Sequence, residues 1–549
     1  MGRAVRWGRT LTIAVVMLLL LSLLTPGTAA AAERPAPPND PYWGDQWSLA
    51  TNPGVGIDLL EAWRYGRGKG VVIAVVDTGI IPQPEFKGRI LPGYDFIRNL
   101  FVANDGDGRD SDPRDPGDWV TKSEAEGGEI ADECKEEASS WHGTHVAGIA
   151  LAAAGNGVGI VGVAPQAKLL PVRAIGKCGG TDRDLVDAIR WAGGLRVEGV
   201  PENRNPADII NLSLGGQQEC SAALQSAIDE LSALEIIVVA AVGNEAIPAA
   251  DFSPANCSGT LTVAATDRDG QRAPYSNYGS YVDVAAPGGA SNANGVISTV
   301  DRGRQGPKGP TLGRLAGTSM AAPHVTGMLA IARGLDPTIS RIELLTLFLD
   351  NLSAFALDTV EYGCSIEELC GAGFADAGAL ISALQTRPTP VVTIDPIRAA
   401  LLNERTELVI SADVGEMSLS LETPELCEFD GQSIYGISRG ECTILSTIPS
   451  TSLTKGFSQR ISIPIRGYDA ELAVEAPDSV KAKSRVTLLI SSASGGALTI
   501  MSKTPSICRI GQANVVRTIS KGTCRVIVRV AETETHERAR QLVLVTVTP

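Results

Sequence analysis

The feature that most constrains the fold is a pair of apolar, β-branched runs, each followed closely by polar residues. Residues 71–76 read Val-Val-Ile-Ala-Val-Val and lead into Asp77, and residues 236–239 read Ile-Ile-Val-Val shortly before Asn244. A run that is apolar at every position is typical of a strand buried on both faces, as in a parallel sheet covered by helices. Ligands of open α/β sheets bind where such strands end. The sequence therefore predicts an α/β domain with a doubly wound, mostly parallel sheet and a site near Asp77 and Asn244.

A candidate nucleophile lies in residues 317–324, which read Gly-Thr-Ser-Met-Ala-Ala-Pro-His. We expect the Ser319 hydroxyl at the start of a helix, beside the partial positive charge of that end. A serine becomes a good nucleophile only when a base removes its proton and a third group orients the base. His142, in Trp-His-Gly-Thr-His-Val-Ala-Gly, is the candidate base, and Asp77 is the candidate orienting group. Each of the two alone is as well explained by a structural role at a turn or a helix end.

In chain order the three candidates are Asp77, His142 and Ser319, which is the triad order of subtilisin-like proteases. The blocks Val-Val-Asp-Thr-Gly, His-Gly-Thr-His-Val-Ala-Gly and Gly-Thr-Ser-Met-Ala-Ala-Pro-His resemble the three signature blocks of that family. A fourth block, residues 239–245, is similar to its oxyanion segment. Four blocks in sequence argue strongly against coincidence. The chain thus resembles a secreted bacterial subtilase from about Trp43 to about Leu384.

The resemblance implies a serine endopeptidase that works through an acyl-enzyme. Ser319 would attack the scissile carbonyl, His142 would act as general base and then acid, and Asp77 would orient the imidazole. Asn244 and the backbone N–H of Ser319 would donate to the oxyanion. No cofactor is expected for catalysis. His145 and His324 are expected to be structural.

The resemblance also assigns the residues that bind the substrate, and their small side chains predict an apolar slot for the P1 residue. Glu245 is expected at its rim, where it widens tolerance toward Lys or Arg. The assigned residues are Ser213, Leu214, Gly215, Gly216, Ala241, Val242, Gly243 and Glu245.

The N-terminus predicts secretion. Arg3, Arg6 and Arg9 precede the apolar residues 11–24 and then the small residues 28–32, which is the order of a signal peptide. No other stretch approaches the length of a membrane span, so we expect the mature chain to be released. A net charge of -15 argues against a nucleic-acid partner. Residues 39–47 resemble the start of a mature enzyme, which leaves no room for an inhibitory pro-domain.

Ten cysteines, all beyond the signal, indicate disulfides. Local spacing predicts the pairs Cys364–Cys370, Cys427–Cys442 and Cys508–Cys524. The remaining pairs follow from the resemblance: Cys134 and Cys178 lie in positions similar to a bridged pair of some secreted subtilases, which leaves Cys220 with Cys257.

The C-terminal part contains an internal repeat. Thr-Pro-Glu-Leu-Cys at residues 423–427 has a counterpart in Thr-Pro-Ser-Ile-Cys at residues 504–508, and both copies are rich in Ser, Thr, Val and Ile. We expect two small β-sandwiches, similar to immunoglobulin-like modules. They would bind cell wall, matrix or substrate, or act only as stabilising or spacing modules. The predicted division is a signal peptide (1–32), a peptidase domain (33–385), a linker (386–393) and two repeats (394–468 and 469–549).

Calcium is the only metal for which the sequence gives a reason. Asn156 resembles a structural calcium ligand of some subtilases, and the acidic residues 104–115 are explained equally well as a calcium loop or as a solvated loop. The substrates implied are proteins and peptides. Two alternatives to a general endopeptidase are a secreted binding or adhesion protein on a protease scaffold and a processing protease of the cell envelope with few substrates.

Overall fold

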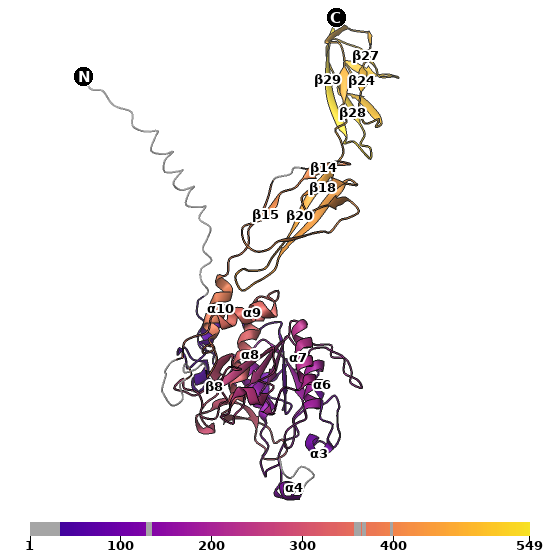
Figure 1. Cartoon of the computed structure of the whole chain (residues 1–549). Coiled ribbons are helices and arrows are strands. Elements are labelled where there is room, and N and C mark those ends of the chain that lie inside the picture. Colours follow the sequence, from indigo (N-terminus) through magenta and orange to yellow (C-terminus); the bar gives the residue numbers. More distant parts are fainter. Residues whose placement is uncertain (1–32, 128–133, 356–363, 365–368, 396–398) are drawn as a thin grey trace, which may run out of the picture. The chain divides into compact units, whose positions relative to one another are not determined.

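The computed structural model describes residues 33–127, 134–355, 364, 369–395 and 399–549. The predicted signal peptide lies outside this part. The chain divides into two compact units, one ending at Thr386 and one beginning at Arg387 (Figure 1). Among the described residues, the helices are too short or too polar to span a bilayer.

The first unit is built on a seven-stranded sheet in which every neighbouring pair is parallel. Its central strands are apolar at nearly every residue because both faces are covered. The order across the sheet is β2 (Tyr94–Asp95), β3 (Lys168–Arg173), β1 (Val72–Asp77), β4 (Ile209–Leu212), β6 (Ile237–Ala241), β8 (Thr260–Thr266) and β9 (Val284–Pro287).

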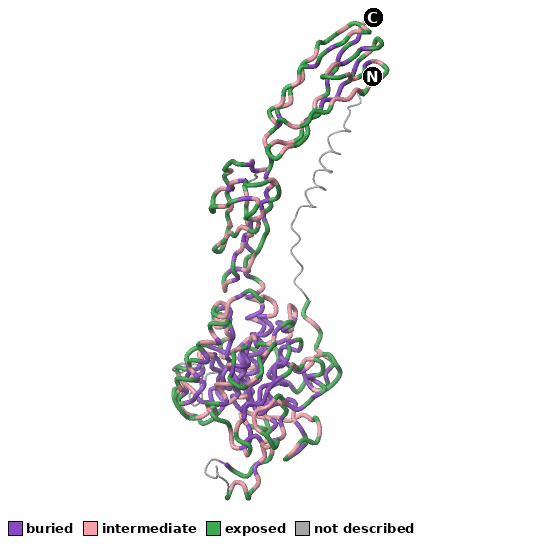
Figure 2. The backbone as a smooth tube through the Cα atoms, turned by 90° about the vertical axis from the view of Figure 1, so that its right-hand side faces the viewer, coloured by how far each residue is buried: buried purple, intermediate pink, exposed green. Residues whose placement is uncertain are grey.

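Helices cover both faces of this sheet, which confirms the predicted doubly wound, mostly parallel architecture. One core cluster joins the sheet to α5 (His142–Leu151), α8 (Thr318–Leu335), α9 (Arg341–Leu349) and α10 (Ala377–Thr386). A second joins the other face to α6 (Asp182–Ala192) and α7 (Ala222–Ala233). Figure 2 shows the buried residues concentrated in these layers. The shorter helices are α2 (Leu59–Ala62), α3 (Leu100–Ala103) and α4 (Lys122–Gly127).

The carboxyl edge of the sheet gathers the residues that the sequence singled out. Asp77 is the last residue of β1, and Asn244 follows the end of β6. The helices α5 and α8 begin at His142 and at Thr318, immediately before Ser319. The assigned substrate residues Ser213 to Gly216 follow directly after β4, which ends at Leu212, and Gly216 begins β5.

Two hairpin-like pairs and three disulfides complete the first unit. Strand β10 (Val296–Asp301) pairs with β11 (Pro310–Leu315), and β5 (Gly216–Gln217) pairs with β7 (Phe252–Ser253), both antiparallel. All five predicted disulfides are present: Cys134–Cys178, Cys220–Cys257 and Cys364–Cys370 in the first unit, and Cys427–Cys442 and Cys508–Cys524 in the second.

The second unit is β-rich and contains the repeat twice with the same strand topology. Each copy has a four-stranded, a three-stranded and a two-stranded sheet, and its disulfide lies in the apolar core. The first copy comprises β13 (Ala400–Leu401), β20 (Phe457–Arg466), β19 (Gly440–Ile448) and β16 (Ser418–Leu421); β14 (Arg405–Glu407), β18 (Ser433–Gly436) and β17 (Cys427–Phe429); and β12 (Val392–Ile394) with β15 (Ile410–Ala412). The second comprises β22 (Ser479–Lys481), β29 (Ala539–Thr548), β28 (Gly522–Val530) and β25 (Leu498–Ser502); β23 (Arg485–Thr487), β27 (Val515–Thr518) and β26 (Cys508–Ile510); and β21 (Ala473–Glu475) with β24 (Leu489–Ser491).

Candidate active site

Asp77 and His142 are hydrogen-bonded at the carboxyl edge of the sheet. The Oδ1 atom of the buried Asp77 accepts from His142 Nδ1 at 2.8 Å and from the backbone N–H of Thr78 at 2.8 Å. Because Nδ1 donates, Nε2 of the neutral ring is left as a proton acceptor. The His142 side chain remains 24% exposed, so this acceptor is accessible from the site.

The charges around His142 favour its protonated form. Burial lowers the pKa of the imidazole, but attraction to Asp77, the hydrogen bond that His142 donates to Asp77, and the charges of Asp118 and Asp115 more than offset this effect. The pKa of His142 therefore lies above its ordinary value of 6.5. A raised pKa makes the neutral imidazole a stronger proton acceptor, which suits a general base.

Ser319 is the second residue of α8 and lies against Ser213. Its hydroxyl donates to the Ser213 carbonyl oxygen at 3.2 Å, and the Ser213 hydroxyl donates to the Ser319 carbonyl oxygen at 2.8 Å. That carbonyl is free of the usual helical bond because residue i+4 is Pro323, which has no N–H. Among the described residues the structure records no hydrogen bond between Ser319 and His142. The fold therefore brings the side chains of Ser319 and His142 to one edge of the sheet, and the Ser319 hydroxyl is turned toward Ser213.

Asn244 lies beside the start of α8. Its Oδ1 atom accepts from the backbone N–H of Thr318 at 2.9 Å and from the Thr318 hydroxyl at 3.0 Å. A Cβ placed on Gly317 would lie 3.6 and 3.7 Å from the two terminal atoms of Asn244 and 3.7 Å from the Ser319 nitrogen. With Oδ1 held by Thr318, the Nδ2 donor of Asn244 and the N–H of Ser319 flank the same small space, which a larger residue at position 317 would fill.

Asn277, which sequence reasoning did not single out, holds the Asn244 loop in place. This fully buried residue accepts at Oδ1 from the N–H groups of Glu245 and Ile247, both at 3.0 Å, and donates from Nδ2 to the Val242 carbonyl at 2.9 Å. The sequence offers only the polar run Tyr-Ser-Asn-Tyr-Gly at residues 275–279 as a signal. A local pattern does not show which distant loop a buried amide will contact.

Glu245 contributes to the same loop. Its Oε2 atom accepts from the N–H of Asn244 at 2.7 Å and from Asn277 Nδ2 at 3.0 Å. The residue is nevertheless exposed, so its charge also faces solvent at the site. The two segments predicted to line the P1 pocket both pack against the ring of Phe252. A Cβ added to Gly215 would lie 2.3 Å from this ring, and a Cβ added to Gly243 would lie 2.8 Å from it.

The acidic residues at 115 and 118 tie the start of α5 to the strand that carries Asp77. Thr78 Oγ1 accepts from the N–H of Gly143 at 3.0 Å and donates to Asp115 Oδ2 at 2.8 Å. Asp118 accepts from the N–H and the hydroxyl of Ser140, two residues before His142. Burial, together with the nearby Asp118, raises the pKa of Asp115 to about 7.

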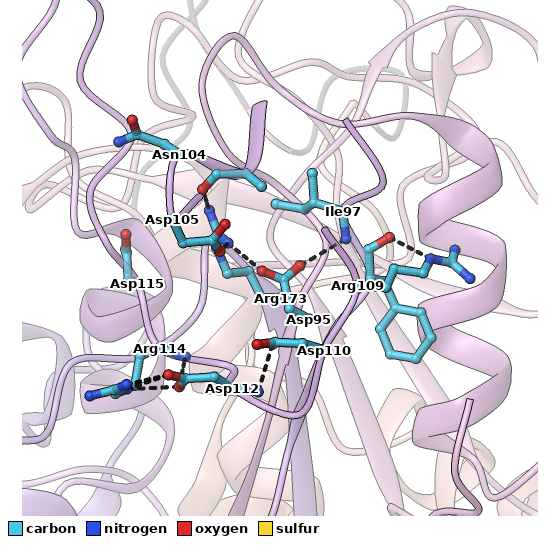
Figure 3. Close-up of polar contacts among 12 residues, drawn as sticks. Asp95, Ile97, Asn104, Asp105, Arg109, Asp110, Asp112, Arg114, Asp115 and Arg173 are labelled. Atoms are coloured by element: carbon cyan, nitrogen blue, oxygen red, sulfur yellow. Dashed lines mark hydrogen bonds and ion pairs between the residues drawn. The ribbon is translucent and has the colours of Figure 1, made fainter. Parts of the chain in front are cut away.

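The rest of the acidic stretch is occupied by internal contacts (Figure 3). Arg173, fully buried on β3, binds the carboxylates of Asp95 and Asp105, while Asp112 pairs with Arg114. In the described part of the chain, no group of three or more His, Cys, Asp or Glu residues is arranged to hold a metal ion. Sequence reasoning could not foresee that Arg173 would use these carboxylates.

The other histidines of the first unit are buried. His324 Nδ1 lies 2.8 Å from the Met320 carbonyl and Nε2 lies 2.9 Å from the Ser48 hydroxyl, so both ring nitrogens have structural partners. Burial lowers the pKa of His324 to about 4 and that of His145 to about 3. Both rings are neutral at physiological pH.

An Asp–His hydrogen bond beside a serine at a helix start, all at the carboxyl edge of a parallel sheet, is the arrangement of the subtilisin-like class of α/β proteins. The chain belongs to the subtilase family, since the sequence model described as "Subtilase family" matches residues 68–373.

Several known proteins are similar to this chain. It is 42% identical over 363 residues to an "Extracellular basic protease" of Dichelobacter nodosus, a match that covers 65% of this chain and 58% of that protein. It is 40% identical over 346 residues to an "Extracellular protease" of Xanthomonas campestris pv. campestris, a match that covers 63% of this chain and 57% of that protein. A solved protease structure from Pseudoalteromonas arctica has a TM-score of 0.59 and 45% identity, and the match covers 64% of this chain and 100% of that one. This chain thus spans less than three fifths of the length of the two relatives named first.

Proposed function

We propose that this chain is a secreted serine endopeptidase that hydrolyses proteins through an acyl-enzyme. The observation that carries the proposal is the 2.8 Å hydrogen bond between Asp77 and His142, at the sheet edge where Ser319 begins its helix. Membership of the subtilase family and the likeness to two extracellular proteases support it. Catalysis of this kind needs no cofactor.

In the proposed reaction, rotation of the Ser319 side chain turns its hydroxyl from Ser213 toward Nε2 of His142. His142 takes the proton as Ser319 attacks the scissile carbonyl, and later gives it to the leaving amine. Asp77 holds the ring and stabilises its charged form. Asn244 Nδ2 and the N–H of Ser319 donate to the oxyanion; such a side-chain donor is worth roughly 10² to 10³ in turnover, as found in a subtilisin.

Hydrolysis of casein and labelling by a fluorophosphonate test this proposal on the purified full chain. We expect Ser319→Ala to abolish labelling and to lower kcat by about 10⁶, the size measured for loss of this group in a subtilisin. Absence of labelling in the unchanged protein, despite correct folding, would instead favour a binding protein on a protease scaffold. Cleavage of very few proteins from a mixed set would favour an envelope processing protease.

We propose that substrates bind along the assigned segments, Ser213 to Gly216 and Ala241 to Gly243, with Glu245 at the rim. A neighbouring pocket of about 370 Å³ shares Leu214, Gly215 and Gly216 and is closed on its other side by Thr181 and Leu185. It has room for a further side chain of the substrate. Cleavage mapping with Glu245→Gln tests the specificity: we expect fewer cuts after Lys and Arg, and an unchanged pattern would contradict this role of Glu245.

We propose a structural calcium ion at Asp40, Glu85 and Asn156. Asp40 and Glu85 are only 4% and 2% exposed, and Asn156 Nδ2 donates to Glu85 Oε2 at 2.9 Å. Burial, with a contribution from Asp40, raises the pKa of Glu85 to about 7, which is the situation that a bound cation would relieve. Carboxylate and amide oxygens are the ligands that calcium prefers. The acidic stretch at 104–115 is the competing location.

For the second unit we propose two immunoglobulin-like modules, residues 394–468 and 469–549, joined by a linker at 386–393 to a peptidase domain at 33–385. The apolar core around each disulfide and the shared strand order support this division. Their proposed role is to bind a cell-wall or matrix ligand outside the cell. A purely spacing role predicts no such binding.

A further inference from the structure

The two repeats share a fold but carry opposite charge. Residues 394–468 contain six basic residues (Lys and Arg) and ten acidic residues (Asp and Glu). Residues 469–549 contain eleven basic residues and seven acidic residues. The second repeat is thus the basic part of a chain whose net charge is -15. A shared fold does not require this difference, so we looked for where the extra positive charge lies.

Part of it forms a ladder across the three-stranded sheet of the second repeat. Arg485 of β23 lies opposite Arg517 of β27, and Arg509 of β26 lies opposite Arg517 on its other side. All three are exposed on the outer face, while the residues that alternate with them, such as Val486 and Val516, are buried. Like charges directly opposite one another on adjacent strands destabilise a sheet. The arrangement therefore costs stability unless a ligand neutralises it.

The first repeat does not have this ladder. The corresponding register positions hold Arg405, Tyr435 and Glu428. The positive Arg405 lies on one side of the tyrosine and the negative Glu428 on the other. Arg405 is also paired with Asp430 at 2.6 Å. The same sheet is therefore locally neutral in one copy and triply positive in the other.

The three arginines of the second repeat lack acidic partners. In the described chain none of their guanidinium groups forms an ion pair; the one polar contact is from Arg509 Nε to the Pro505 carbonyl at 3.4 Å. By contrast, Arg439 and Arg460 of the first repeat are paired with glutamates. The ladder keeps its donors available for an external anion.

We propose that the arginine ladder, Arg485, Arg517 and Arg509, binds a linear acidic polysaccharide that carries a carboxylate on each sugar. The inference rests on the proposed ligand-binding role of the repeats and specifies the ligand. Guanidinium groups bind carboxylates through paired hydrogen bonds. Since exposed ion pairs are individually weak, a ligand must engage several at once, which a polymer does.

Spacing and surroundings favour a polysaccharide over a protein. Adjacent strands lie about 4.8 Å apart, which is close to the length of one sugar ring, whereas same-face side chains of an extended peptide repeat at about 6.8 Å. A docked protein would also need an apolar centre. Side chains alternate between the two faces along β23, β27 and β26. On the outer face, which carries the three arginines, Val515 is the one apolar side chain of these strands.

The test measures binding of the full chain to polygalacturonate, with Ser319→Ala present in every version so that binding is independent of proteolysis. Arg485→Gln, Arg509→Gln and Arg517→Gln are combined in one variant. The matched control combines Lys481→Gln, Arg525→Gln and Arg529→Gln, which removes the same charge from exposed positions on β22 and β28 of the same repeat that do not lie opposite one another. Thermal unfolding of both variants confirms that each is folded.

We expect the ladder variant to bind polygalacturonate about tenfold more weakly, which corresponds to about 1.4 kcal/mol, and the control variant to bind like the parent. Binding should also weaken as salt is added. No binding by the parent, or equal loss in both variants, would overturn the proposal. Tighter, ladder-dependent binding to poly-glutamate or to phosphatidylglycerol vesicles would reassign the ligand to an acidic polypeptide or a lipid surface. Casein hydrolysis by a second set of the same variants, made without Ser319→Ala, reports separately on the protease.

Discussion

Ser213 and Ser319 exchange two hydrogen bonds, so that each residue gives its hydroxyl to the carbonyl oxygen of the other. The exchange depends on Pro323, because a residue with an N–H at that position would take the Ser319 carbonyl into the helical ladder. Asn211 extends the arrangement by donating to the Ser213 hydroxyl at 2.9 Å. The proposed nucleophile is thus positioned by the strand β4 as well as by its own helix.

Ser213→Ala should lower both stability and turnover. The half-buried Ser319 carbonyl and the buried Nδ2 of Asn211 would both lose their partner, and an unsatisfied buried polar group costs about 1–3 kcal/mol of unfolding free energy. We expect kcat to fall while KM changes little, because the substitution disturbs the position of the nucleophile. Urea unfolding and casein kinetics measure the two effects. Adding Pro323→Ala should restore part of the stability by supplying the missing N–H; full stability of Ser213→Ala alone would contradict the argument.

Asp115→Asn should shift the acidic limb of the pH–rate profile to lower pH. The charge of Asp115 helps to raise the pKa of His142, and the reaction needs the neutral imidazole. Because the pKa of Asp115 is itself about 7, its charge is present mainly above that pH. Removing the charge therefore lowers the pKa of His142 mainly in the upper part of the limb, so we expect the gain in activity near pH 7 and little change at pH 5–6. The amide oxygen can still accept from the N–H of Gly117 while Nδ2 faces the Thr78 hydroxyl, so only the bond to Thr78 has to change direction.

Thr78→Val is the complement to Asp115→Asn, because it removes the hydrogen bonds to Gly143 and Asp115 without changing charge. We expect a lower kcat and an unmoved acidic limb. Profiles of kcat/KM from pH 4.5 to 9 distinguish the two variants. If both variants shifted the limb equally, the effect would be structural and not electrostatic.

Asn277→Ala should lower kcat by up to about 10², since loss of an oxyanion donor costs roughly 10² to 10³ and this change loosens the loop that carries the proposed donor, Asn244. KM should change much less. Asn203→Ala is the matched control, because Asn203 also donates to backbone carbonyls, those of Trp191 and Ala192, outside the site. Equal losses in the two variants would show that Asn277 has no special relation to Asn244.

Chelation of calcium should lower the midpoint of thermal unfolding by a few degrees, because a ligand at 100 times its dissociation constant adds about 2.7 kcal/mol. Glu85→Gln should abolish most of this response. Asp112→Asn in the acidic stretch should leave it intact. The reverse pattern would place the ion in the acidic stretch, and an unchanged midpoint in the parent protein would exclude a stabilising calcium ion under those conditions.

The sequence predicted the parts of the fold and site that are encoded locally. The apolar run ending at Asp77 identified a buried strand, and the motif order identified Asp77, His142 and Ser319 as one group. It did not predict that Asp115 would contact Thr78 or that Asn277 would contact Glu245, because each of these is a contact of a buried polar group with a residue more than 30 positions away in sequence. Such partnerships depend on how loops meet at the sheet edge, which no local pattern specifies.

The order in which the cysteines pair has a consequence for export. Each disulfide joins a cysteine to the next one along the chain: 134 with 178, 220 with 257, 364 with 370, 427 with 442, and 508 with 524. A polypeptide that emerges from a translocation pore N-terminus first can therefore close every bridge with the first thiol that arrives. Correct oxidation requires no waiting for distant segments and no reshuffling of wrongly joined pairs.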